Sequence, residues 1–148
     1  ALFDELQQRG LEPNIITYSA LISACEKGGQ WEKALALFEE LQRRPLEPDI
    51  ITYTALISAC EASGRLSEAR ALFFDAHSRG LLRNLHSVPG VLDLHELRLP
   101  VSRMAVRVAL DDRLGRASLE GRFGVSWGTS KGDFVIIPGR GKHSEDGV

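Results

Sequence analysis

The apolar residues in the first half of the chain recur at helical spacing. From Ile16 onward they follow one another at steps of three and four residues, which places them on one face of a helix. The members of this face are Ala20, Leu21, Ala24 and Cys25. Gly28–Gly29 ends the pattern, and a second apolar stripe runs from Ala34 to Leu41. The pattern predicts two helices joined by a glycine turn, each with one side to bury.

The same pattern returns at a constant offset of 35 residues. Residues 13–26 read PNIITYSALISACE, and residues 48–61 read PDIITYTALISACE. Residues 1–7 return in the same way as residues 36–42. A period of this length indicates a helical solenoid, because one helix pair is too small to bury its stripe and must stack on its neighbours. Such a solenoid is a surface for an extended partner, so most enzyme folds are excluded for this half of the chain.

We therefore expect an α-helical solenoid of helix-turn-helix repeats. It is expected to comprise a partial repeat at residues 1–14 and full repeats at residues 15–49 and 50–84. Because the sequence starts inside a repeat and without methionine, we expect it to be a piece of a longer protein. The equivalent Cys25 and Cys60 are expected to be buried packing residues rather than a disulfide or a zinc site.

The charge of the first half argues against non-specific binding of nucleic acid by this solenoid. The chain of 148 residues has a net charge of −2, and residues 1–84 carry 9 basic and 12 acidic side chains. Non-specific nucleic-acid binding requires clustered lysine and arginine, which this half lacks. Nucleic-acid binding would therefore have to use placed base contacts. No apolar run approaches the roughly 20 residues that cross a bilayer, so we expect no membrane contact.

The repeated residues also resemble a known family. The string I-I-T-Y-[ST]-A-L-I-S-A-C, followed by A-L-F-E-E-L and L-E-P-D, resembles the pentatricopeptide repeat of organellar RNA-binding proteins. The tetratricopeptide repeat has a 34-residue period and a W-L-G-Y signature, which is absent here. The resemblance implies a partner, single-stranded RNA, and a location in plastids or mitochondria. We expect the protein to be a monomer.

The family reads about one base per repeat with two or three side chains. Carried over by position, the resemblance implies that bases are contacted by Asn14, Ile16, Ser19, Asp49, Ile51, Thr54 and Asn84. The pair Ser19 and Asp49 implies guanine, whose edge offers two donors to a carboxylate, and Thr54 with Asn84 implies adenine. The isoleucines would hold a base on its flat faces. The alternative is that the polar residues cap helices, as Ser, Thr, Asp and Asn commonly do.

The second half predicts a different architecture. Residues 85–90 indicate a linker, residues 91–95 alternate as a strand does, Pro100 opens a helix, and residues 133–137 form a second strand. Strand, helix and strand in this order indicate a right-handed crossover in a small α/β domain. We expect this domain, incomplete, over residues 91–148.

Two motifs of this half resemble the small MutS-related domain, namely V-L-D-L-H at residues 91–95 and I-I-P-G-R-G-K-H-S at residues 136–144. The resemblance implies catalytic roles for Asp93, His95 and His143. It implies phosphate binding by Gly139, Arg140, Gly141 and Lys142. DNA is a possible partner of this domain, and Mg²⁺ or Mn²⁺ would be needed only for cleavage. The alternatives are phosphate binding without cleavage and a purely structural pair of Asp93 and His95.

The leading hypothesis is sequence-specific binding of single-stranded RNA in organellar RNA processing, stability or expression. One alternative is an endonuclease that acts through the second half. The other is a protein–protein scaffold that holds a peptide in the solenoid groove, which the net charge of −3 over residues 1–84 favours.

Overall fold

The computed structural model describes residues 2–83, 85, 91–95, 97–113 and 135–137. It divides into two compact units, residues 1–72 and 73–148. The division falls inside the repeat predicted for residues 50–84. No helix among the described residues has both the length and the apolar content needed to cross a membrane.

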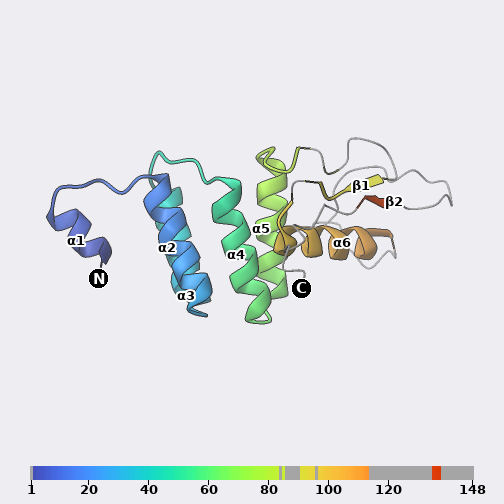
Figure 1. The fold of residues 1–148 in the computed structure, drawn as a ribbon, viewed down its shortest axis with the longest axis horizontal. Coiled ribbons are helices and arrows are strands. Elements are labelled where there is room, and N and C mark those ends of the chain that lie inside the picture. The colour runs from blue at the N-terminus through green and yellow to red at the C-terminus, as the bar shows by residue number, and fades with distance from the viewer. Residues whose placement is uncertain (1, 84, 86–90, 96, 114–134, 138–148) are drawn as a thin grey trace, which may run out of the picture. The chain divides into compact units, whose positions relative to one another are not determined.

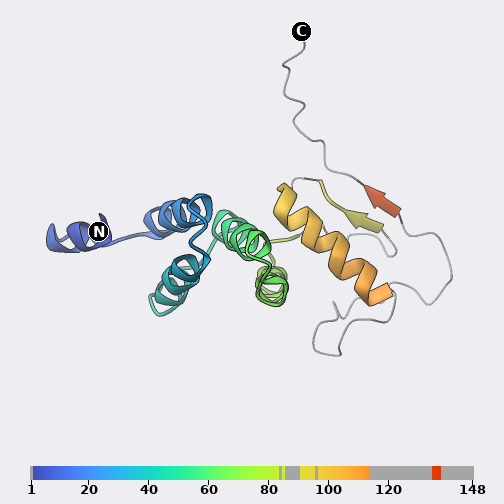
Figure 2. The same ribbon diagram turned by 90° about the horizontal axis from the view of Figure 1, so that it is seen from below.

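The repeats consist of helices joined by short turns (Figure 1). Their bounds are α1 (Leu2–Gln8), α2 (Ile15–Lys27), α3 (Trp31–Gln42), α4 (Ile50–Ala62) and α5 (Leu66–Ser78). The predicted helix pairs and their glycine turns are confirmed, since α2 ends directly before Gly28–Gly29. Within the first unit, α2 packs against α3 and α4, and α3 also contacts α4, as both views show (Figures 1 and 2).

The core of the first unit lies between these three helices. From α3, the predicted stripe residues Ala34, Phe38 and Leu41 are buried. The ring of Phe38 meets the edge of Tyr53 from α4 at a centroid distance of 5.3 Å and an interplanar angle of 70°. This T-shaped contact is a favoured geometry for two aromatic rings. It helps join the second helix of one repeat to the first helix of the next.

On α2 the predicted buried face was wrong. Ala20 and Ala24 are exposed, whereas Tyr18 and Ile22 are fully buried. Cys25 is only half-buried, although its equivalent Cys60 is buried, and both are free thiols. The physical reason is that burial depends on the neighbouring helices: the equivalent Ala55 and Ala59 are buried on α4, which packs against α2, whereas Ala20 and Ala24 have no such cover among the described residues.

The turn between α2 and α3 has a defined hydrogen-bond pattern. The amide of Gln30 donates to the carbonyl oxygen of Cys25 at 2.9 Å, and the amide of Gly29 donates to that of Glu26 at 3.1 Å. These two bonds make a Schellman motif, which requires a left-handed residue after the helix. Gly29 supplies it with a φ of 66°. Gly64 takes the same role after α4 with a φ of 73°.

The second unit contains a strand, a helix and a strand. These are β1 (Val91–Asp93), α6 (Leu99–Arg113) and β2 (Val135–Ile137). The strands pair in parallel, with Leu92 opposite Ile136, and α6 runs alongside them in both views (Figures 1 and 2).

The apolar face of α6 accounts for its place beside the strands. Its buried residues recur at helical spacing and are Val101, Met104, Ala105, Val108 and Ala109. Leu92 of β1 is fully buried as well. The predicted order of elements is observed. The α/β domain as a whole stays a prediction, because residues 114–134 and 138–148 lie outside the described residues.

Candidate nucleic-acid interface

Two of the predicted base-contacting residues are helix N-caps. Asp49 precedes α4, and its Oδ1 accepts hydrogen bonds from the amide and the hydroxyl of Thr52, both at 2.8 Å. Asn14 precedes α2, and its Oδ1 accepts from the amide and the hydroxyl of Thr17 at 3.1 and 3.2 Å. The capping role is therefore present at both positions. It satisfies backbone amides that the first turn of a helix leaves without a partner.

Asp49 also takes part in a contact between repeats. The hydroxyl of Ser19 on α2 lies 2.7 Å from that of Thr52 on α4, and 3.4 Å from Asp49 Oδ1. We call Ser19, Asp49 and Thr52 the hydroxyl–carboxylate cluster. Each hydroxyl has one proton. Because the Thr52 hydroxyl donates to the carboxylate, its oxygen is left to accept the proton of Ser19.

Among the described residues, one oxygen of the Asp49 carboxylate has no hydrogen-bond partner. All of its hydrogen bonds fall on Oδ1, and no bond to Oδ2 is found among the described residues. The carboxyl side chain is half-buried, and Ser19 is only 7% exposed. The structure thus brings the predicted pair together. Within the described part of the chain, the Ser19 hydroxyl is hydrogen-bonded to protein groups, whereas Oδ2 of Asp49 is not.

The two predicted base-clamping residues are exposed. Ile16 and Ile51 lie in the first turns of α2 and α4, two residues after the caps Asn14 and Asp49, and their exposed fractions are 73% and 46%. Large aliphatic side chains with this much exposure keep apolar area in contact with water. They lie on the two helices that the cluster joins, three residues before Ser19 and one residue before Thr52 in the sequence.

The second predicted pair is described only in part. Thr54 is buried, and its hydroxyl donates to the carbonyl oxygen of Ile50 at 2.6 Å. Asn84 lies outside the described residues. The structure therefore places Thr54 at the position equivalent to Ser19, but it does not show the pair.

Sequence reasoning missed the part that Thr52 takes in this site. The signal was present, because a threonine stands three residues after the cap in both repeats, at Thr17 and Thr52. It missed a second contact as well, in which the hydroxyl of Tyr18 donates to Glu40 Oε1 at 3.0 Å. Arg44 binds the same carboxylate oxygen at 3.2 Å and lies over the Tyr18 ring, 5.8 Å from its centroid. Burial, followed by the bond to Glu40, raises the pKa of Tyr18 to about 12.

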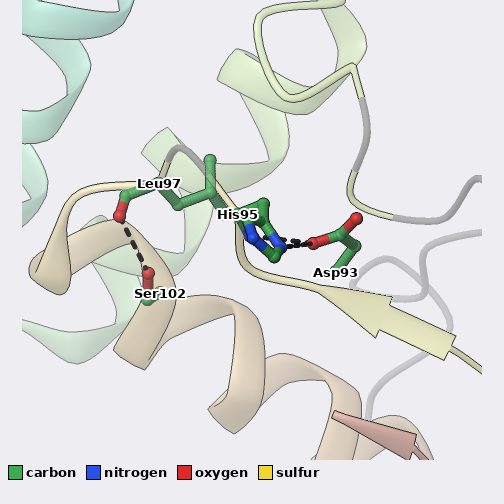
Figure 3. A network of polar contacts seen from close by, with 4 residues as sticks. All are labelled: Asp93, His95, Leu97 and Ser102. Atoms are coloured by element: carbon green, nitrogen blue, oxygen red, sulfur yellow. Dashed lines mark hydrogen bonds and ion pairs between the residues drawn. The ribbon is translucent and has the colours of Figure 1, made fainter. Parts of the chain in front are cut away.

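In the second unit, Asp93 and His95 lie together at the end of β1 (Figure 3). The amide of His95 donates to Asp93 Oδ1 at 2.8 Å, and its ring Nδ1 lies 3.3 Å from the same oxygen. This arrangement orients an exposed imidazole, which is what both a catalytic and a structural pair require. His143 and residues 139–142 lie outside the described residues. Within the described part of the chain, no group of three or more His, Cys, Asp or Glu is placed to hold a metal ion.

Comparison with known families identifies the repeats. The chain matches the family model of the pentatricopeptide repeat domain twice, over residues 1–65 and 36–73. The match supports a pentatricopeptide repeat protein, and such repeats suggest RNA binding in general. No curated protein matches the chain significantly. The likeness of residues 91–148 to the small MutS-related domain stays a prediction from its motifs.

Proposed function

We propose that the repeats bind single-stranded RNA with base preference, and that Asp49 reads one base. The observation that supports this is the hydroxyl–carboxylate cluster. It holds Asp49 through Oδ1 and leaves Oδ2 without a partner among the described residues. The exposed Ile16 and Ile51 provide apolar surface in the first turns of the two joined helices.

The chemistry of the cluster favours guanine. An ionised carboxylate only accepts hydrogen bonds, and the Watson–Crick edge of guanine offers two N–H donors. Adenine offers one donor and one acceptor there, which an asparagine amide matches better than a carboxylate. Ser19 contributes indirectly, because its small side chain leaves room for a purine while its hydroxyl supports Thr52.

The direct test is Asp49→Asn, which keeps a capping oxygen and exchanges one acceptor for a donor. Binding is measured to RNA oligonucleotides that differ only in the base at one position. We expect wild type to prefer guanine and the variant to prefer adenine, by roughly the 1–3 kcal/mol of a well-formed base contact.

Glu47→Gln makes the same change of charge two residues away, at an exposed position outside the cluster, and should leave the preference for guanine in place. A wild type that binds all four bases equally, or a variant with unchanged preference, would exclude Asp49 as a reader. A basic peptide that competes with RNA would instead support the scaffold function.

Three further proposals rest on family resemblance. The protein would act in plastids or mitochondria, in RNA processing, stability or expression. The second half would bind the phosphate backbone of RNA or DNA through residues 139–142, or would cleave it through Asp93, His95 and His143 in a reaction that uses Mg²⁺ or Mn²⁺. Cleavage would require a histidine to act as a general acid or base, and the exposure of His95 and its contact with Asp93 are compatible with that role.

A further inference from the structure

The hydroxyl of Thr52 contacts both members of the predicted base-reading pair. It donates a hydrogen bond to Oδ1 of Asp49 at 2.8 Å, and it lies 2.7 Å from the hydroxyl of Ser19 on α2. Thr52 is fully buried, with an exposed fraction of 0%. A bound RNA therefore cannot reach Thr52 directly, and any influence of this residue on a base must pass through Ser19 or Asp49.

The direction of these hydrogen bonds fixes where the two hydroxyl protons lie. Each hydroxyl has one proton, and Thr52 donates its proton to the carboxylate of Asp49. The proton of Ser19 has two acceptors within the protein, namely Thr52 Oγ1 at 2.7 Å and, at the longer distance of 3.4 Å, Asp49 Oδ1. Ser19 is therefore left with lone pairs only, so it can accept a hydrogen bond from a base but cannot donate one.

Thr52 also fixes the orientation of the Asp49 carboxylate. Oδ1 accepts hydrogen bonds from the amide and from the hydroxyl of Thr52, both at 2.8 Å. The first bond comes from the backbone and is independent of the side chain, whereas the second needs the hydroxyl. The terminal torsion of an aspartate side chain is broad, and two bonds to one oxygen restrict it. The direction of Oδ2, for which no hydrogen bond is found among the described residues, therefore depends on the Thr52 hydroxyl.

We propose that Thr52 is a positioning residue that sets the base preference of Ser19 and Asp49. Because it takes the Ser19 proton and holds Oδ1, the pair presents hydrogen-bond acceptors and no donor. Guanine fits such a surface with the two N–H donors of its Watson–Crick edge, whereas the acceptor on the edge of adenine would find no donor.

The proposal makes base preference a property of two successive repeats. Ser19 and Asp49 belong to the repeat predicted for residues 15–49, and Thr52 belongs to the next one. A residue of the second repeat would thus help decide which base the first one prefers. This inference rests on the proposed function, since it takes Asp49 as the residue that reads the base.

Thr52→Val is the diagnostic variant, because valine keeps the branched shape and the amide bond to Asp49 but removes the hydroxyl. The Ser19 proton then loses its nearest acceptor and can turn towards a base. We expect the preference for guanine over adenine to fall by about fivefold, as the loss of one hydrogen bond would give. Thr52→Ser keeps the hydroxyl and should retain most of the preference. Dissociation constants are measured for RNA oligonucleotides that differ only in the base at one position.

Ser58→Ala is the matched control for a weakened interface between α2 and α4. The Ser58 hydroxyl donates to Glu26 Oε1 at 2.8 Å, so this hydrogen bond joins the same two helices outside the cluster. Any loss of affinity in this variant should be equal for all four bases, and the ratio of the guanine and adenine dissociation constants should stay that of wild type.

A second measurement tests the hydrogen bonds without RNA. The midpoint of thermal unfolding is compared for Ser19→Ala, Thr52→Val and the double variant. We expect each single change to lower the midpoint by about 3 °C. The double variant should lose clearly less than the sum of the two, because both changes remove the same hydrogen bond.

The outcomes separate this inference from the proposed function. An equal loss of affinity for all four bases in Thr52→Val, or additive changes of the midpoint, would overturn the role of Thr52, while a wild-type preference for guanine would still support Asp49 as a reader. A wild type without base preference would overturn both. A preference that weakens in Thr52→Val and persists in Thr52→Ser and Ser58→Ala would support the positioning role.

Discussion

The hydroxyl–carboxylate cluster shows how few side chains hold a repeat interface. Ser19 and Thr52 are both buried, and a buried hydroxyl without a partner costs about 1–3 kcal/mol. Here each hydroxyl meets another oxygen, at 2.7 and 2.8 Å. The same bonds that avoid this cost also orient Asp49, so stability and the proposed base recognition depend on one set of atoms.

Tyr18 leads to a prediction about alkaline pH. Its pKa is raised from 10.0 to about 12, so the folded state keeps a proton that the unfolded state loses above pH 10. This contribution to stability is fully present below pH 10 and is lost as the pH rises towards 12. We expect urea unfolding to show a falling free energy of unfolding over this range. Tyr18→Phe should flatten that part of the profile.

Cys60 supplies the control for this experiment. Burial, followed by the charge of Glu68, raises the pKa of its thiol from 9.0 to about 11. The contribution of Cys60 to stability should therefore be lost as the pH rises from about 9 to about 11, one pH unit below the range for Tyr18. Cys60→Ala should flatten the stability profile over that lower range. If Tyr18→Phe and wild type lose stability in parallel between pH 10 and 12, Tyr18 does not carry the effect.

At the scale of the helices, adjacent glycines in one turn have different roles. Gly29 has a φ of 66°, in the left-handed region, whereas Gly28 has a φ of −82°, which any residue adopts. Only Gly29 should therefore be sensitive to gaining a side chain.

We expect Gly29→Ala to lower the free energy of unfolding by about 1 kcal/mol, through strain in the backbone. Gly28→Ala should be neutral or stabilising by about 0.5 kcal/mol, because alanine restricts the unfolded chain more than glycine does. In the folded state the new Cβ would lie 3.4 Å from the carbonyl oxygen of Ala24, which the turn can accommodate. Chemical denaturation of both variants measures the difference. Equal losses would show that the turn tolerates no side chain at either position.

At the scale of the whole molecule, charge limits how RNA can be bound. The net charge is −2, and the repeat half is more acidic than basic. Few phosphates can be neutralised, so the proposed RNA affinity should depend mainly on base contacts.

Increasing the salt concentration should therefore weaken binding only slightly. With about two phosphate contacts to a single strand, we expect a loss of less than about tenfold between about 50 and 200 mM salt. Titration of labelled RNA at several salt concentrations measures the slope. A loss of a hundredfold or more would show that arginine and lysine contacts to phosphate dominate instead.

Much of the fold follows from the sequence alone. The 35-residue period determined the helix pairs, the glycine turns and the positions of the caps, because each depends on backbone conformations and hydrogen bonds within a few residues. The cap at Asp49 and the turn at Gly29 are examples. The order of strand, helix and strand in the second half could be predicted as well, because the pattern of apolar residues within each element is also local.

Only the tertiary structure decided which of these residues meet. The Ser19–Thr52 contact joins residues 33 positions apart, and that of Tyr18 with Glu40 joins residues 22 positions apart. Ala20 and Ala55 show the physical reason most directly. They occupy the same position in nearly identical helices, yet one is exposed and the other buried, because burial depends on whether another helix lies alongside and no local sequence encodes that.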